Sequence, residues 1–437
     1  MMRCVSAIKE MTVVPHFMIA VLFLLLRLPL FAQHAVPLVK ATSKTVTIRD
    51  GNHLKTGYWA VLPEKKPDCY FVELPQKAHP VTFITDQDSI SFDVVYGNDY
   101  DFIILLNGKD SCYTRISARY NNLNTFIRGR AGIRPDTIPF TLGDNRKIYV
   151  QAKLNGATIR NIQLDMGAGG TVINKASVGK VKMNFDQKVT LANSDGVNLV
   201  SSASKNVLQI GKLVWDSVSI AVAGNMKENE DLIIGNSLFK DKILEINYNN
   251  RLLVVHDTLP PQVAAYSRHD LILDGGTIPY IVVSLTIRNK TQTGWVMFDT
   301  GARTSILNSE DVSMPLRIMT ELADMIGLDD AIVPKLRIGN YQLSGFEYKT
   351  RQMGTAGLNM ILGNDLLRRF NLVFDNKNGY LYMQPNVLTN APYGKRDEYY
   401  VVRGVVAVFL IIAFIVIFKK VRKKPGRMGE TGSRIFM

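Results

Sequence analysis

The sequence predicts an all-β protein with a small N-terminal β-sandwich-like domain, two equivalent β lobes, a signal peptide and one C-terminal transmembrane helix. Three observations support this prediction. Short runs rich in Val, Ile, Phe and Tyr alternate with turn signals over most of the chain. A block of sequence in the second half occurs twice, which indicates equivalent structural units. An apolar run lies near each end of the chain.

The composition excludes a disordered chain and a dedicated nucleic-acid-binding protein. The chain has 437 residues, of which 46% are hydrophobic and 21% charged, so it has enough apolar surface for two or three packed domains. Its net charge is +14, but residues 419–437 contribute +6 of this and residues 1–32 contribute +2. The rest is too thinly spread to form a phosphate-binding surface.

Residues 1–32 have the pattern of a secretory signal peptide. Arg3 and Lys9 precede an apolar run at 17–26, and Ala32, after which we expect cleavage, ends the pattern. A retained signal anchor is the alternative. The ten residues of this run are too few to span a bilayer, which favours cleavage.

Residues 401–418 are predicted to form a transmembrane helix, preceded by a juxtamembrane segment at 387–400. The run at 404–418 is apolar throughout, and the tail at 419–437 begins with a cluster of Lys and Arg. Such clusters stay in the cytoplasm, so the bulk of the chain is expected outside it. A buried core helix is the alternative for this run.

Residues 33–120 are predicted to form the small β domain. Asp50-Gly51, Gly97-Asn98 and Asn107-Gly108 are turn signals between its apolar runs, a spacing typical of a sandwich. The domain contains no catalytic pattern, which leaves its role open, and binding of a protein partner is one candidate role. Residues 121–137 are polar, contain prolines and are predicted to be a linker.

The cysteines leave one question open. Cys4 leaves with the signal peptide, and Cys69 and Cys112 remain in an oxidising compartment where a disulfide is allowed. Two separate thiols are an equally good interpretation. No Cys or His spacing resembles a metal or redox site, so neither a metal nor a cofactor is expected.

The duplicated block relates residues 231–254 to residues 359–382. The two share seven identities in 24 aligned positions, and each follows an acidic glycine turn, at Asp165 and at Asp299. The interval from the aspartate to the glycine of the block is 70 residues in the first copy and 64 in the second. The lobes are therefore predicted at 138–258 and 271–386, with an interlobe linker at 259–270.

These motifs resemble the aspartic peptidases. The pattern Asp-Thr-Gly-Ala at 299–302, followed by Ser or Thr and aliphatic residues and later by an apolar-apolar-Gly element, is similar to this family, and the Ala is similar to its retroviral branch. The resemblance covers about residues 138–386. It implies the bilobal acid-protease fold with two psi-shaped loops, in which Gly235 and Gly363 end the apolar elements and Asp165 meets Asp299.

The resemblance implies that Asp165 and Asp299 are catalytic. Two close carboxyl groups that share one proton can remove a proton from water and protonate the carbonyl oxygen of a peptide. Met166 departs from the family pattern, because it has no hydroxyl where the second copy has Thr300. Of the two hydroxyl contacts that link the lobes in the family, the one from Thr300 should therefore be present and the other missing. The residues expected to support the pair are Gly167, Ala168, Thr300, Gly301 and Ala302.

A flap is expected about 30 residues after Asp165. Asn193, Ser194, Asp195 and Gly196 lie between two strand-like pieces, which is a strong hairpin signal. In the family such a hairpin closes over the substrate, and a plain surface hairpin is the alternative. The second copy has a helix-like segment at 319–328 instead, so one flap is expected.

The leading functional hypothesis is a membrane-anchored aspartic endopeptidase that cleaves peptides or proteins in the periplasm or outside a bacterium. The alternative is a weak or inactive pseudo-peptidase that binds peptides or proteins at the cell envelope. A third hypothesis pairs Asp299 with the same residue of a second chain and leaves the first lobe a structural role.

Overall fold

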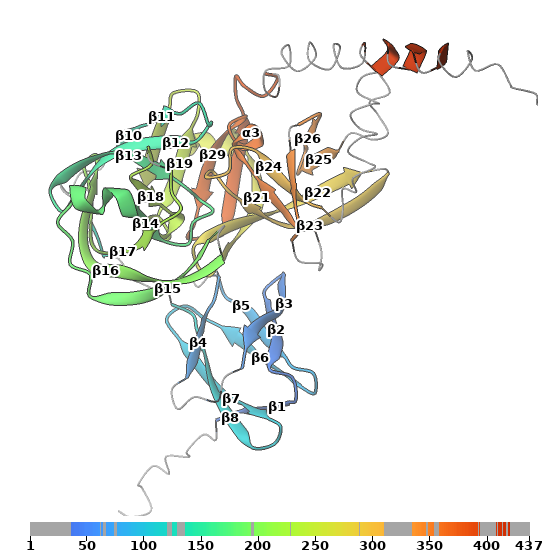
Figure 1. Cartoon of the computed structure of the whole chain (residues 1–437). Coiled ribbons are helices and arrows are strands. Elements are labelled where there is room, and N and C mark those ends of the chain that lie inside the picture. The colour runs from blue at the N-terminus through green and yellow to red at the C-terminus, as the bar shows by residue number, and fades with distance from the viewer. Residues whose placement is uncertain are drawn as a thin grey trace, which may run out of the picture.

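The computed structural model shows a chain built almost entirely of β-strands (Figure 1). It describes residues 36–61, 63, 67–73, 77–119, 125–128, 136–193, 196–227, 229–287, 289–309, 334–346, 348–353, 358–391 and 393, together with single positions between 408 and 419.

The N-terminal domain consists of two four-stranded sheets. One has the order β1 (Leu38–Ala41), β7 (Asp99–Leu106), β8 (Asp110–Ser117) and β4 (Asp68–Phe71), and the other the order β3 (His53–Ala60), β2 (Thr45–Asp50), β5 (His79–Ile84) and β6 (Ser89–Val94). Alternate side chains of both sheets, such as Ile48, Phe83, Phe102 and Ile104, fill one shared apolar core. This arrangement is the sandwich that the sequence predicts.

The two thiols of this domain are free, so the disulfide interpretation is wrong. Cys69 pairs in register with Arg115 on β8, three residues from Cys112 and therefore about 10 Å from it along the strand. Cys112 is buried in the core, whereas Arg115 lies on the other face of β8. A disulfide requires Cα atoms within about 7 Å and converging side chains, and neither condition holds.

Lobe 1 is a twisted sheet with the order β11-β12-β13-β18-β14-β17-β16-β15. Its elements are β11 (Thr141–Leu142), β12 (Ile148–Leu154), β13 (Ala157–Leu164), β14 (Thr171–Asn174), the 3₁₀ helix η1 (Lys175–Lys180), β15 (Gln187–Asn193), β16 (Gly196–Ile210), β17 (Leu213–Ala223), β18 (Leu232–Ile234) and the 3₁₀ turn η2 (Asn236–Leu238).

Lobe 2 repeats this plan in shorter form. Its elements are β21 (Ser267–Asp274), β22 (Ile278–Ile287), β23 (Lys290–Phe298), β24 (Ser305–Asn308), β25 (Lys335–Ile338), β26 (Tyr341–Ser344), β27 (Tyr348–Arg351), β28 (Met360–Leu362) and α3 (Asn364–Leu367). The helix-like segment at 319–328 lies outside the described residues.

Each lobe contains one psi-shaped loop. In lobe 1, β18 inserts between β13 and β14, with a parallel pairing on one side and an antiparallel pairing on the other. In lobe 2, β28 inserts between β23 and β24 in the same way. The outer two residues of each of these short strands are buried and the middle one is half-buried, which explains why both copies carry consecutive apolar residues there.

A six-stranded sheet joins the lobes, with the order β10 (Asp136–Pro139), β20 (Leu252–His256), β19 (Ile243–Asn247), β29 (Phe370–Asp375), β30 (Tyr380–Pro385) and β21. Each lobe provides three strands, and β19 and β29 pair across the pseudo-twofold axis. One apolar core runs through both lobes and this sheet. The lobes therefore form a single packed body.

The two predicted linkers contain regular structure. In residues 121–137, β9 (Thr125–Arg128) pairs with β17 and β10 begins the six-stranded sheet. In residues 259–270, the 3₁₀ helix η3 (Pro261–Ala265) is followed directly by β21. β9 and β10 have four residues each, and β10 follows Pro135 and ends at Pro139, so the surrounding sequence resembles a loop and tertiary pairing makes these segments strands.

The sandwich packs against lobe 2 (Figure 1). The ammonium of Lys55, on β3, lies 2.5 Å from Glu73 in its own domain and 2.6 Å from Asp274 at the end of β21. The ring of His53 lies at the edge of the Trp295 ring. A buried cation between two carboxylates thus links the two domains.

The predicted segments at the chain ends fall largely outside the described residues. Residues 1–32 do so entirely, and the tail at 419–437 is described only at its first residue. In the predicted span at 401–418, the positions that are described are helical and exposed. No helix in the described part of the chain is both long and apolar enough to cross a membrane.

Candidate active site

The predicted catalytic aspartates occupy equivalent turns in the two lobes. Asp165 follows β13, and its backbone N–H donates to the Ile234 carbonyl oxygen at 2.9 Å. Asp299 follows β23, and its N–H donates to the Leu362 carbonyl oxygen at 3.0 Å. In each lobe the inserted strand of the psi loop therefore fixes the backbone of the aspartate.

The two aspartates face each other across the lobe interface. A Cβ atom added at Gly167 would lie 2.6 Å from Cγ of Asp299, and one added at Gly301 would collide with the carboxylate of Asp165. The two carboxyl groups are close enough for the charge of Asp299 to raise the pKa of Asp165. Each glycine therefore makes room for the aspartate of the other lobe, because a larger residue in either turn would separate the carboxyl groups.

Backbone N–H groups orient both carboxylates. Gly167 donates to Oδ1 of Asp165 at 2.9 Å, and Gly301 donates to Oδ1 of Asp299 at 2.7 Å. Ala302 adds a second bond to Oδ1 of Asp299 at 3.1 Å, whereas the N–H of Ala168 donates to the backbone carbonyl of Asp165. The two halves of the site therefore differ in the number of backbone donors.

Asp165 holds a proton more tightly than an ordinary aspartate. Burial raises the pKa of Asp165 well above its usual value, and the negative charge of Asp299 beside it raises it further. The charge of Lys147 and the bond from Gly167 act in the opposite direction. Two carboxyl groups so close cannot both ionise at low cost. One of them can therefore stay protonated while the other is ionised and able to accept a proton.

One threonine joins the two turns. Thr300, which is fully buried, accepts a hydrogen bond from the N–H of Met166 at 3.0 Å and donates its hydroxyl to the Leu164 carbonyl oxygen at 3.0 Å. Met166 is also fully buried and offers no hydroxyl for the reciprocal pair of bonds. The interlobe grip is one-sided, as the sequence predicts.

The psi-loop glycines are required by close packing rather than by an unusual backbone angle. A Cβ at Gly235 would collide with the carbonyl oxygen of Ala168, and one at Gly363 would lie 2.6 Å from the carbonyl carbon of Thr304. Both glycines therefore let an inserted strand end directly against the turn that follows an aspartate.

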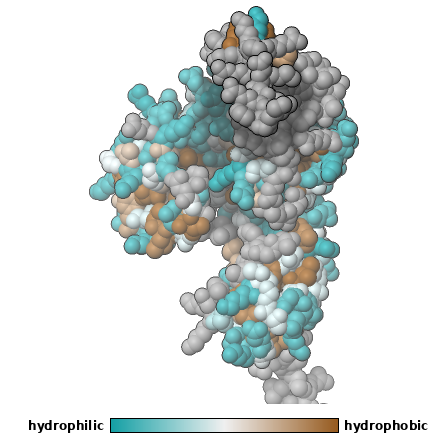
Figure 2. Space-filling view, turned by 45° about the vertical axis from the view of Figure 1, so that its right-hand side comes forward, coloured by the Kyte–Doolittle hydropathy of each residue, from teal (hydrophilic) through white to brown (hydrophobic). Residues whose placement is uncertain are grey.

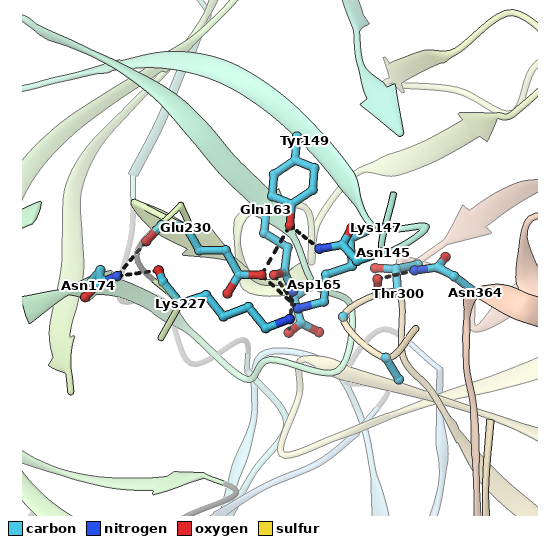
Figure 3. Close-up of polar contacts among 12 residues, drawn as sticks. Asn145, Lys147, Tyr149, Gln163, Asp165, Asn174, Lys227, Glu230, Thr300 and Asn364 are labelled. Carbon is cyan, nitrogen blue, oxygen red and sulfur yellow. Dashed lines mark hydrogen bonds and ion pairs between the residues drawn. The ribbon is translucent and has the colours of Figure 1, made fainter. Parts of the chain in front are cut away.

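A polar network that sequence reasoning missed lies behind Asp165 (Figure 3). Gln163 donates from its amide to Oδ2 of Asp165 at 3.2 Å and accepts a hydrogen bond from Lys147 at 2.9 Å. Lys147 also lies 3.0 Å from Oε1 of Glu230. The one available signal was a glutamine in an otherwise apolar strand end, at a position where the second copy has Met297.

The predicted hairpin forms, with Asn193 opposite Gly196 at its tip. Ser194 and Asp195 lie outside the described residues. On β16, Val197 is 73% exposed and Leu199 is 70% exposed, although both are apolar. Figure 2 shows apolar surface along the lower edge of lobe 1, the edge at which Figure 1 places β15 and β16.

No protein-family model and no curated protein matches the chain. Among solved structures, it is similar to the aspartic proteinase from Irpex lacteus, with 14% sequence identity and a TM-score of 0.45. The match covers 59% of this chain and 99% of that chain. At this distance the likeness adds nothing to the strand pairings given above, on which the description of the fold rests.

Metal chemistry has no obvious site in the described residues. No group of three or more His, Cys, Asp or Glu side chains there is placed to hold a metal ion. The acid and base groups that the described geometry offers next to the turns are the two aspartates themselves.

Proposed function

We propose that this chain is an aspartic endopeptidase with both catalytic aspartates in one polypeptide. The observation that carries the proposal is the reciprocal fit of the two turns, in which Gly167 makes room for Asp299 and Gly301 makes room for Asp165. This fit brings two half-buried carboxyl groups close together. It also argues against a site shared between two chains, because each aspartate already has its partner.

In the proposed reaction the ionised carboxyl group removes a proton from a water molecule, which attacks the carbonyl carbon of the peptide. The protonated carboxyl group donates its proton to the carbonyl oxygen, and proton transfer to the leaving nitrogen then completes the cleavage. The bonds from Gly167 and Gly301 keep both carboxylates in line. The hairpin of β15 and β16, with its exposed Val197 and Leu199, is the proposed flap over the substrate.

We further propose that the enzyme is exported by the signal peptide at 1–32 and anchored by the helix at 401–418, with its catalytic part in the periplasm or outside the cell. The basic tail at 419–437 supports this orientation. The expected substrates are peptides or proteins, and the sandwich is the proposed site for a protein partner.

The second candidate is a pseudo-peptidase that binds peptides without cleaving them. The observation in its favour is Met166, because a one-sided grip holds the two turns together less firmly than two threonines would. The retained Asp165, Gly167 and Ala168 favour the enzyme.

The deciding experiment is digestion of a peptide library by the purified full chain in detergent, with Asp165→Asn and Asp299→Asn as matched variants. An amide fills the same volume but cannot carry the shared proton, so each variant should lose at least about 100-fold in rate. Melting temperatures should not fall by more than about 4 °C in either variant. Peptide binding without cleavage by the unmodified chain would support the pseudo-peptidase instead.

A further inference from the structure

Gln163 is a buried polar residue that needs hydrogen-bond partners. Its relative exposure is 1%, and it lies on β13 between Tyr149 of β12 and Ile233 of β18. A buried amide without hydrogen-bond partners is less stable than the same amide in water. Its two partners, Lys147 and Asp165, meet that need from opposite sides.

These partners fix the orientation of the amide. The ammonium of Lys147 can only donate, so the atom of Gln163 that faces it at 2.9 Å must be the oxygen. The amide nitrogen then faces Oδ2 of Asp165 at 3.2 Å and must donate to it. Oδ2 of Asp165 is therefore held as an acceptor, which disfavours the shared proton at that atom.

Lys147 is itself held from behind. Glu230, whose side chain is 5% exposed, accepts from Lys147 at 3.0 Å and from the Tyr149 hydroxyl at 3.2 Å. The backbone oxygen of Glu230 accepts a further bond from the amide of Asn174 at 2.8 Å. Figure 3 shows the resulting chain of contacts from Glu230 through Lys147 and Gln163 to Asp165.

Lobe 2 has no such chain at the equivalent positions. In lobe 1, Tyr149 pairs with Gln163, and in lobe 2, Tyr280 pairs with Met297. These equivalent pairs show which residue of one lobe corresponds to which residue of the other. The three polar residues of lobe 1 have apolar counterparts, namely Ile278 for Lys147, Met297 for Gln163 and Leu358 for Glu230. The fold itself therefore does not require polar residues there, since the second copy is built without them.

We propose that Glu230, Lys147 and Gln163 form a positioning relay, present only in lobe 1, that holds Oδ2 of Asp165 in a fixed orientation as a hydrogen-bond acceptor. This inference rests on the proposed function for its role in catalysis. The relay supplies Asp165 with a side-chain donor, whereas Asp299 is served by the extra N–H of Ala302. The two aspartates thereby receive different environments, which a site with distinct acid and base members needs.

The relay should influence the proton affinity of the pair. In the described residues, the titratable groups that face Asp165 directly or through the relay are Asp299 from lobe 2 and Lys147, Tyr149 and Glu230 from lobe 1. A donor to Oδ2 and a nearby cation both favour the ionised form, so loss of the relay should raise the apparent pKa of the pair.

The test measures the pH dependence of the unfolding free energy of the full chain, in detergent, for the unmodified protein and for Gln163→Met, which introduces the residue of lobe 2. Both are repeated with Asp165→Asn, which removes the titrating group. A second variant, Lys147→Met with Glu230→Leu, removes both charges together and leaves no unpaired ion, and Lys147→Arg is the conservative replacement. Tyr149→Phe is the matched control, because it leaves Lys147, Gln163 and Asp165 in contact.

The unfolding free energy falls as Asp165 ionises in the folded protein. In Gln163→Met and in the double variant this fall should occur at a pH higher by about half a unit to one unit, as expected for the loss of one hydrogen bond. The shift should vanish with Asp165→Asn and be small in Lys147→Arg and Tyr149→Phe. Equal changes with and without Asp165, or no change, would overturn the relay. Because this measurement needs no turnover, it tests the relay even if the unmodified chain cleaves no peptide, an outcome that would count against the proposed function alone.

Discussion

Thr300 of lobe 2 accepts a hydrogen bond from the N–H of Met166 in lobe 1 and returns one to the Leu164 carbonyl oxygen, each at 3.0 Å. Among the described residues, these two bonds of the Thr300 side chain link the two aspartate turns. Because Met166 has no hydroxyl, the link depends on a single side chain. Thr300 is therefore the residue at which the closeness of Asp165 and Asp299 can be tested most directly.

Replacement of Thr300 by Val should destabilise the protein by about 1 to 3 kcal/mol, because a buried N–H and a buried carbonyl lose their partner. Thr300→Ser retains the hydroxyl and is the matched control. Unfolding in urea gives the stability change, and peptide cleavage should fall in Thr300→Val more than in Thr300→Ser. Equal stability of the two variants would mean that the hydroxyl does not hold the turns together.

Gly235 should not tolerate alanine. The added Cβ would collide with the Ala168 carbonyl oxygen in the turn after Asp165, so the loss of stability should be at least about 2 kcal/mol. Gly170→Ala is the matched control, because a Cβ at Gly170 meets nothing within 4 Å. Thermal unfolding of both variants checks this, and a Gly235→Ala protein as stable as Gly170→Ala would contradict the tight contact.

Lys55 should be needed to hold the sandwich on lobe 2. Burial would lower the pKa of Lys55, but Glu73 and Asp274 outweigh this and raise it, so the ammonium stays charged between them. Lys55→Met removes the buried ammonium that Glu73 and Asp274 share, at an expected cost of about 3 to 5 kcal/mol. The exposed Lys44→Met is the control. Limited proteolysis should separate the sandwich from the lobes in Lys55→Met only.

The structural features that the sequence predicts are those encoded within a few consecutive residues. The aspartate turns and the psi-loop glycines were predictable, because each is encoded in a few consecutive residues and repeated in a second copy. The relay was not, since Lys147, Gln163 and Glu230 meet only when β12, β13 and the segment before β18 lie side by side. No short pattern marks such a contact.

The same reasoning explains the corrected predictions. The strands β9 and β10 are stabilised by partners far along the chain, β17 and β20, and each has only four residues within a polar, proline-containing segment. The position of Cys69 opposite Arg115 follows from the parallel register of β4 and β8, which the spacing of two cysteines cannot reveal. Long-range pairing therefore decided each feature that local sequence missed.

The last prediction concerns Asp365, the second residue of α3 and two residues after Gly363. Its Oδ1 accepts bonds from the N–H and the hydroxyl of Ser305 at 2.8 and 2.9 Å, but its Oδ2 is buried and has no hydrogen-bond partner among the described residues. Burial raises the pKa of Asp365 to about 7, although the bonds from Ser305 oppose the shift. The neutral form is thus the one that the folded protein accommodates.

The sign of the pH effect on stability follows from this raised pKa. Between pH 3.8, the ordinary pKa of an aspartate, and pH about 7, the folded protein binds a proton at Asp365 that the unfolded chain has released. Stability from this group is therefore complete below pH 3.8 and declines as pH rises to about 7, by on the order of a few kcal/mol. Asp365→Asn keeps the acceptor for Ser305 and cannot ionise, so urea unfolding between pH 4 and pH 7.5 should show a shallower decline than in the unmodified chain. The part of the decline that remains belongs in part to Asp165, and Asp165→Asn should reduce it separately. An unchanged slope in Asp365→Asn would mean that the carboxyl group is already ionised at low pH, with a partner for Oδ2.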